Sequence, residues 1–129
     1  MMAHMQESPT SVLIIEDDSS VGRSMVALLQ CSGFSPTLVT TADQAHEAML
    51  EANDFDVVLL DLQLDHERGE SLIESVRACG AAITPIVIYS AMSTVVAQVA
   101  FKQLGAAAVL GKNSDVTEII RALKLAAHG

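Results

Sequence analysis

Short apolar runs alternate with longer segments of helical periodicity along this chain. Each run holds four or five mainly apolar residues bounded by polar residues or glycine, which is typical of a strand buried on both faces of a sheet. The predicted strands are residues 11–15, 36–39, 57–60, 85–89 and 107–110. Because a helical segment follows each strand after a short connection, the pattern predicts right-handed crossovers and a parallel sheet with helices on both faces.

Capping residues and glycines mark where the predicted helices begin and end. Ser19 or Ser20 is a suitable N-cap for the first helix, and Gly33 can adopt the left-handed conformation that ends it. Residues 41–44 have the T-x-x-Q form of a capping box at the start of the second helix. Gly105 is expected to end the fourth helix in the same way as Gly33 ends the first.

The third and fifth helices follow the same rules. A third helix is predicted around residues 72–76 and is closed by Gly80. The last helix is capped by Ser114 or Asp115, and the acidic side chain of Asp115 also favours the positive N-terminal end of a helix.

Three of the predicted strands end on side chains that can carry chemistry. Strand 11–15 is followed by Glu16, Asp17 and Asp18, strand 57–60 by Asp61, and strand 85–89 by Ser90. Ligands of open α/β sheets bind in the crevice outside the carboxyl ends of the strands. We therefore expect these side chains to line one acidic pocket, with Lys112 just past the last strand.

The predicted pocket favours a divalent cation and phosphoryl chemistry. Crowded carboxylates at Glu16, Asp17 and Asp61 must either take up a proton or bind a cation, and a site made only of oxygen ligands suits Mg²⁺. An aspartate is a known nucleophile for phosphoryl groups. A metal ion and the Lys112 ammonium would hold the phosphoryl oxygens, where the charge lies, and the Ser90 hydroxyl could donate to one of them.

Composition restricts the other possibilities. The 129 residues fit one domain, and the net charge of −9 argues against nucleic-acid binding by this chain itself. No apolar run approaches the ~18 residues of a membrane span, and no secretory signal is visible. Cys31 and Cys79 are expected to be buried or half-buried reduced thiols. Residues 1–10 are expected to be a disordered lead-in left by expression.

Four short motifs, in order, resemble the receiver domain of bacterial two-component response regulators. They are IIEDD after the first strand, LLDLQL around Asp61, IYSA around Ser90, and GAAAVLGK ending in Lys112. The resemblance covers about residues 11–127. It implies a flavodoxin-like, three-layer α/β fold with a five-stranded parallel sheet in the order 2-1-3-4-5, and residues 11–129 as one receiver domain.

The same resemblance implies a role for each site residue. Asp61 would be the phosphoacceptor. Mg²⁺ would be bound directly by Asp17 and Asp61, through water by Glu16, and by the backbone carbonyl of Gln63.

The implied phosphoryl contacts are Ser90, which would move toward the phosphoryl group on activation, and Lys112, which would pair with Asp61 or the phosphoryl oxygens. Three positions depart from the family pattern. Val109 stands where an aromatic switch residue is usual, Asn113 follows the lysine where proline is usual, and Asp65 stands where proline is common.

The resemblance also implies partners and a location. The phosphoryl donor would be a sensor histidine kinase or phosphotransfer protein in the cytoplasm, and a homodimer could form through the fourth helix, fifth strand and fifth helix. The last segment is similar to receivers that precede a helix-turn-helix output domain. The chain is expected to be either a stand-alone receiver or, as the N-terminus left by expression favours, a piece of a longer transcription regulator that contacts DNA only through that output domain.

The leading hypothesis is a phosphorylation-switched signalling domain that catalyses only its own aspartyl phosphorylation and dephosphorylation, so it is not an enzyme acting on a metabolite. One alternative is a degenerate receiver that binds partners without phosphorylation. A less favoured alternative is an aspartate-nucleophile phosphatase, which commonly needs a second acid two residues after the nucleophile, where Gln63 stands here. A flavin site is disfavoured because carboxylates, not a phosphate-binding loop, follow the first strand.

Overall fold

A five-stranded parallel sheet forms the centre of the molecule. The structure, a computed structural model, describes residues 9–52, 55–62, 73–74, 77–78, 84–90, 95–111 and 114–128. Its strands lie in the order β2-β1-β3-β4-β5, and each is parallel to its neighbours. They are β1 Thr10–Ile15, β2 Phe34–Val39, β3 Val57–Leu62, β4 Ile86–Ser90 and β5 Ala108–Gly111. The predicted fold class and strand order are confirmed.

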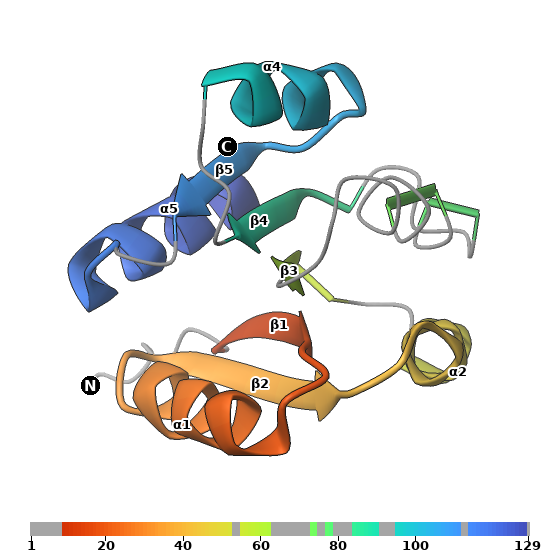
Figure 1. Ribbon diagram of the computed structural model, residues 1–129. Helices are drawn as coiled ribbons and strands as arrows, with labels where there is room; N and C mark the ends of the chain where they lie inside the picture. The colour runs from red at the N-terminus through yellow and green to blue at the C-terminus, as the bar shows by residue number, and fades with distance from the viewer. Residues whose placement is uncertain are drawn as a thin grey trace.

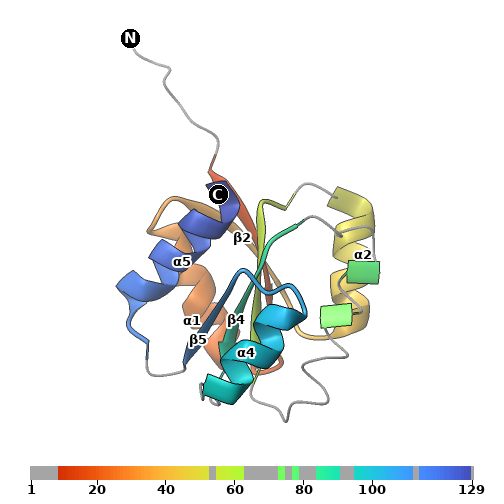
Figure 2. The same cartoon turned by 90° about the horizontal axis from the view of Figure 1, so that it is seen from above.

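Helices cover both faces of this sheet (Figures 1 and 2). α1 and α5 lie on one face, and α2 and the helical residues 73–74 and 77–78 lie on the other. The bounds of the helices are α1 Ser19–Gln30, α2 Ala42–Ala52, α4 Val95–Gln103 and α5 Val116–His128. The predicted third helix around residues 72–76 falls largely outside the described residues.

Alternation along the strands divides the core into two clusters. Leu13, Ile15, Val58 and Leu60 are buried together with Met49 of α2 and Phe101 of α4. The intervening residues, among them Ile14, Val57 and Leu59, are buried with Leu29 of α1 and Leu123 of α5. Successive side chains of a strand point to opposite faces, so apolar residues at every position are what a sheet covered on both faces requires.

Asp18, rather than a serine, caps α1. Its Oδ1 accepts hydrogen bonds from the backbone N–H groups of Ser20 at 2.9 Å and Val21 at 3.2 Å. The prediction of Ser19 or Ser20 as N-cap was therefore wrong by one or two residues, because the helix already includes both serines. The Asp18 carboxylate is held at the helix terminus, where it satisfies backbone donors that would otherwise lack partners.

The capping box of α2 is formed with a shifted return bond. The Gln44 N–H donates to Thr41 Oγ1 at 3.1 Å, as the sequence predicts. Gln44 Oε1, however, accepts from the Thr40 N–H at 2.8 Å, one residue earlier than in the standard box. At α5 the Glu118 N–H donates to Asp115 Oδ1 at 3.0 Å, so Asp115 is the cap.

Two glycines end helices with positive φ angles, as predicted. Gly33 follows α1 with φ +88°, and Gly105 follows α4 with φ +96°. The carbonyl of Gly105 accepts a hydrogen bond from Arg77, whose guanidinium also donates to the Thr84 carbonyl just before β4. Burial lowers the pKa of Arg77 below its ordinary value. This one side chain therefore links the segment around residue 77 to the starts of β4 and β5.

Candidate functional site

Asp61 lies within strand β3 and is buried. The strand extends to Leu62, so the sequence placed its end two residues too early. Asp61 is only 8 % exposed. Leu59, two residues earlier in the strand, packs in the core cluster with α1 and α5. Residues two apart in a strand point to the same face, so the Asp61 carboxylate lies on the face of the sheet that α1 and α5 cover.

Glu16, the residue directly after β1, is the neighbour of Asp61 on that side of β3. Ile15 pairs with Leu60 in the parallel register of β1 and β3. Glu16 and Asp61 are the next residue on each side, so they lie opposite each other. Adjacent strands lie ~4.8 Å apart, and Glu16 is 1 % exposed. The fold therefore brings two buried carboxylates side by side at the carboxyl edge of the sheet.

The turn after β1 separates the three acidic residues of the EDD motif. Glu16 Oε1 accepts a hydrogen bond from the Asp18 N–H at 3.0 Å, which fixes its carboxylate against the turn. Asp17 is exposed, and Asp18 caps α1. Of the three, Glu16 is directed into the molecule, Asp17 lies at the surface beside it, and Asp18 is engaged by the helix.

Ser90 ends β4 at the same edge of the sheet. It is 2 % exposed and pairs in register with Leu62 of β3 and Gly111 of β5. The structure thus brings Glu16, Asp61 and Ser90 to one edge, as the sequence predicts. Two other predicted residues, Lys112 and Gln63, lie outside the described residues, although Lys112 follows directly on the end of β5.

The described carboxylates fit a magnesium ion without forming a closed cage. No group of three or more His, Cys, Asp or Glu side chains among the described residues is arranged to hold a metal ion. Mg²⁺ keeps several waters and usually takes only one or two protein carboxylates. Two adjacent buried carboxylates repel each other, and a cation beside them lowers that repulsion. Glu16, Asp61 and the exposed Asp17 therefore supply a donor set that suits this ion.

Sequence reasoning missed the residue on the other side of Asp61. Tyr89 of β4 pairs in register with Asp61 of β3 and with Leu110 of β5. It is half-buried and packs against the cluster shared with α1 and α5, the face on which Asp61 lies. The available signal was the phenol within the otherwise apolar run IVIYS, but the strand register was needed to use it.

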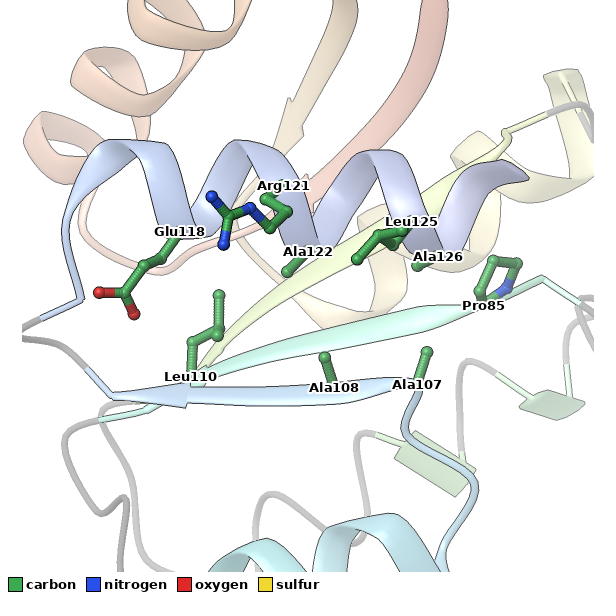
Figure 3. A pocket seen from close by; sticks show the side chains of 9 residues that line it. All are labelled: Pro85, Ala107, Ala108, Leu110, Glu118, Arg121, Ala122, Leu125 and Ala126. Carbon is green, nitrogen blue, oxygen red and sulfur yellow. The ribbon is translucent and has the colours of Figure 1, made fainter. Parts of the chain in front are cut away.

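A groove of about 590 Å³ lies away from this edge, between α5 and β5, with Pro85 just before β4 at one end (Figure 3). Small side chains leave the space open: Ala107 and Ala108 on the strand side, Ala122 and Ala126 on the helix. Glu118 and Arg121 lie toward one end, and Leu125, which is 67 % exposed, lies on the helix side. None of the predicted site residues lines this groove.

Comparison with known proteins identifies the family. The model of the response regulator receiver domain family matches residues 12–124, and the chain belongs to this family. It is 32 % identical over 114 residues to the transcriptional regulatory protein DltR of Streptococcus agalactiae serotype III, covering 88 % of this chain and 50 % of that protein. It is 32 % identical over 115 residues to BasR of Escherichia coli K12, covering 87 % and 51 %. The chain thus spans about half the length of these curated relatives.

Solved structures agree with this assignment. A sensor protein from Polaromonas sp. JS666 is 28 % identical with a TM-score of 0.78, covering 91 % of this chain and 94 % of that one. The chemotaxis protein CheY4 of Vibrio cholerae has a TM-score of 0.80 at 21 % identity, covering 92 % and 98 %, which shows the shared fold. Within the part of the chain that is described, no helix is long and apolar enough to cross a membrane.

Proposed function

We propose that this receiver domain is switched by phosphorylation of Asp61. The observation that carries the proposal is the buried pair of carboxylates, Asp61 in β3 and Glu16 directly after β1, at the edge where Ser90 also lies. A buried carboxylate beside a second one is poised for cation binding, and a cation there would serve a phosphoryl group that Asp61 accepts.

In the proposed reaction a carboxylate oxygen of Asp61 attacks the phosphorus of the donor. A new P–O bond to Asp61 forms as the bond from phosphorus to the donor breaks, and the bonding electron pair leaves with the donor. From a phosphohistidine the leaving group is the imidazole, which takes up a proton. Hydrolysis later returns the Asp61 carboxylate and inorganic phosphate.

Asp17, Asp61 and the backbone carbonyl of Gln63 would hold Mg²⁺ directly, and Glu16 would hold it through water. The ion, when bound, supplies positive charge to the phosphoryl oxygens. We infer that the Ser90 hydroxyl donates to one of these oxygens and that the Lys112 ammonium pairs with another or with Asp61. Because Glu16 is fixed by the Asp18 N–H, its side chain needs little reordering when the ion arrives.

We propose residues 11–129 as the receiver unit, a cytoplasmic location, and a sensor histidine kinase or phosphotransfer protein as phosphoryl donor. The relatives DltR and BasR are named as transcriptional regulators, which supports a role in transcription through a further domain. A degenerate receiver remains the alternative, since it would share the fold but accept no phosphoryl group.

Intact-mass spectrometry after incubation with acetyl phosphate and Mg²⁺ tests the proposal. We expect the mass to rise by one phosphoryl group and to return slowly to its starting value as the acyl phosphate hydrolyses. A parallel sample with Mg²⁺ chelated should gain little. No gain from acetyl phosphate or from a panel of phosphorylated histidine kinases would contradict phosphorylation and favour the degenerate receiver.

We further propose the face formed by α4, β5 and α5 as a partner or homodimer surface. Val95 and Val99 of α4 and Leu125 of α5 are large apolar side chains that are 76 %, 51 % and 67 % exposed, and the groove of Figure 3 adjoins α5. Large apolar side chains that are exposed on the elements of one face are a feature of interaction sites.

Analytical ultracentrifugation checks this surface. Phosphorylated protein is expected to sediment as a dimer at concentrations where the unmodified protein is monomeric, and Val99→Glu should restore the monomer because it buries a charge in the contact. Leu50→Glu on α2 is the matched control, since Leu50 is also exposed but lies on another helix. Equal effects of the two variants would contradict the assignment.

A further inference from the structure

Asp61 is the middle member of a row that crosses the sheet. Glu16 precedes it on the side of β1, and Tyr89 and Leu110 follow it on β4 and β5. All lie at one level on the face covered by α1 and α5. The carboxylate therefore has another carboxylate on one flank and an aromatic ring on the other.

Tyr89 is the neighbour of Asp61 on the side of β4, and it lies on the same face of the sheet. Neighbouring strands lie about 4.8 Å apart, so side chains in register on the same face of two strands are within contact range. Tyr89 is half-buried and packs against the same core cluster as Leu59, so the ring is anchored by its apolar surroundings. A ring anchored beside Asp61 would limit the rotation of its carboxylate toward β4 and would shield that flank from water.

We propose that Tyr89 is a positioning residue for the phosphoacceptor, its ring holding the Asp61 carboxylate in the orientation from which it attacks phosphorus. This inference rests on the proposed phosphorylation of Asp61. Attack requires the carboxylate oxygen, the phosphorus and the leaving group to be nearly in line, and loss of alignment slows such reactions steeply. A partly desolvated carboxylate is also the better nucleophile.

Rates of phosphorylation by acetyl phosphate test the proposal when they are measured by intact mass on the full chain. Tyr89→Ala is expected to accept the phosphoryl group about tenfold more slowly than the wild type at saturating donor and Mg²⁺. Tyr89→Phe, which keeps the ring, is expected to rescue most of this loss. The Tyr89→Ala substitution should lower the maximal rate of phosphorylation. It should not change the concentration of acetyl phosphate at which the rate is half-maximal.

Val87→Ala is the matched control for a purely structural effect. Val87 is fully buried in β4 and belongs to the same core cluster as Tyr89. It lies two residues before Tyr89 on the same face of the strand, and so further from the carboxyl edge of the sheet. The Val87→Ala substitution removes apolar side-chain atoms from the core, but it leaves Glu16, Asp61 and Tyr89 unchanged. If Val87→Ala slows phosphorylation as much as Tyr89→Ala, or if Tyr89→Phe is as slow as Tyr89→Ala, the proposal is overturned.

A second readout does not depend on phosphoryl transfer. The chain contains one tyrosine and no tryptophan, so tyrosine fluorescence reports on Tyr89 alone. Because a metal ion at Asp61 changes the charge beside the ring, Mg²⁺ should change the emission saturably in the wild type. Protein that gains a phosphoryl group only with Mg²⁺, yet shows no emission change, would overturn the placement of Tyr89 but leave the proposed function intact. Protein that gains none would overturn both.

Discussion

Asp61→Asn is expected to gain no phosphoryl group from acetyl phosphate under conditions in which the wild type does. The amide keeps the size and shape of the carboxylate but lacks the anionic oxygen that attacks phosphorus. Its folding should not suffer, because the substitution keeps the size of the side chain and removes one of two buried carboxylates, Asp61 in β3 and Glu16 directly after β1. Without Mg²⁺ we expect a melting temperature at least equal to that of the wild type.

Intact mass and thermal unfolding of the same sample measure both effects. Glu51→Gln is the control, because it removes an exposed carboxylate from the last turn of α2, at the opposite edge of the sheet. That variant should be phosphorylated like the wild type. A phosphoryl group on the Asp61→Asn variant would show that another residue is the acceptor.

The second large effect concerns the metal. In the wild type, Mg²⁺ at about 100 times its dissociation constant should stabilise the fold by ~2.7 kcal/mol, which raises the melting temperature by on the order of 10 °C. Asp17→Asn is expected to lose most of this response, since Asp17 is the exposed carboxylate that the ion would bind directly. The stability without Mg²⁺ should change little, because an exposed side chain contributes little to the core.

Asp18→Asn is a closely matched control for this experiment. It removes one negative charge from the adjacent residue, but asparagine caps a helix as well as aspartate does, so the bonds to Ser20 and Val21 can persist. Its Mg²⁺ response should stay close to that of the wild type. If both variants lose the response equally, the ion is attracted by the total charge of the EDD motif and not by a ligand at Asp17.

Much of the fold follows from local pattern. The apolar runs that end at Ile15 and before Asp61 are strands because their lengths and boundaries admit little else, and Gly33 and Gly105 end helices because they adopt positive φ angles. The local sequence was less informative where several neighbouring residues could serve as the helix cap. Asp18, Ser19 and Ser20 can all cap a helix, and only the place where the chain leaves β1 selected Asp18.

Exposure was a second limit of sequence reasoning. Cys31 was expected to be at least half-buried as part of α1, but the structure places it after the last residue of the helix, exposed to solvent. Its neighbour Leu29 is fully buried within the same helix. A difference of two residues rotates a side chain to another side of the helix, so an error in where the helix ends changes the predicted burial.

The sequence by itself determined the strand–helix alternation and the acidic and hydroxyl residues at the strand ends, because these depend on local periodicity and side-chain chemistry. Only the tertiary structure decided which of them are neighbours. The register of β1, β3 and β4 places Glu16 and Tyr89 on either side of Asp61, and the turn after β1 leaves Asp17 at the surface. These strands are apolar on both faces, so they lack the alternation that fixes the register of a half-buried strand, and packing of the whole core sets it instead.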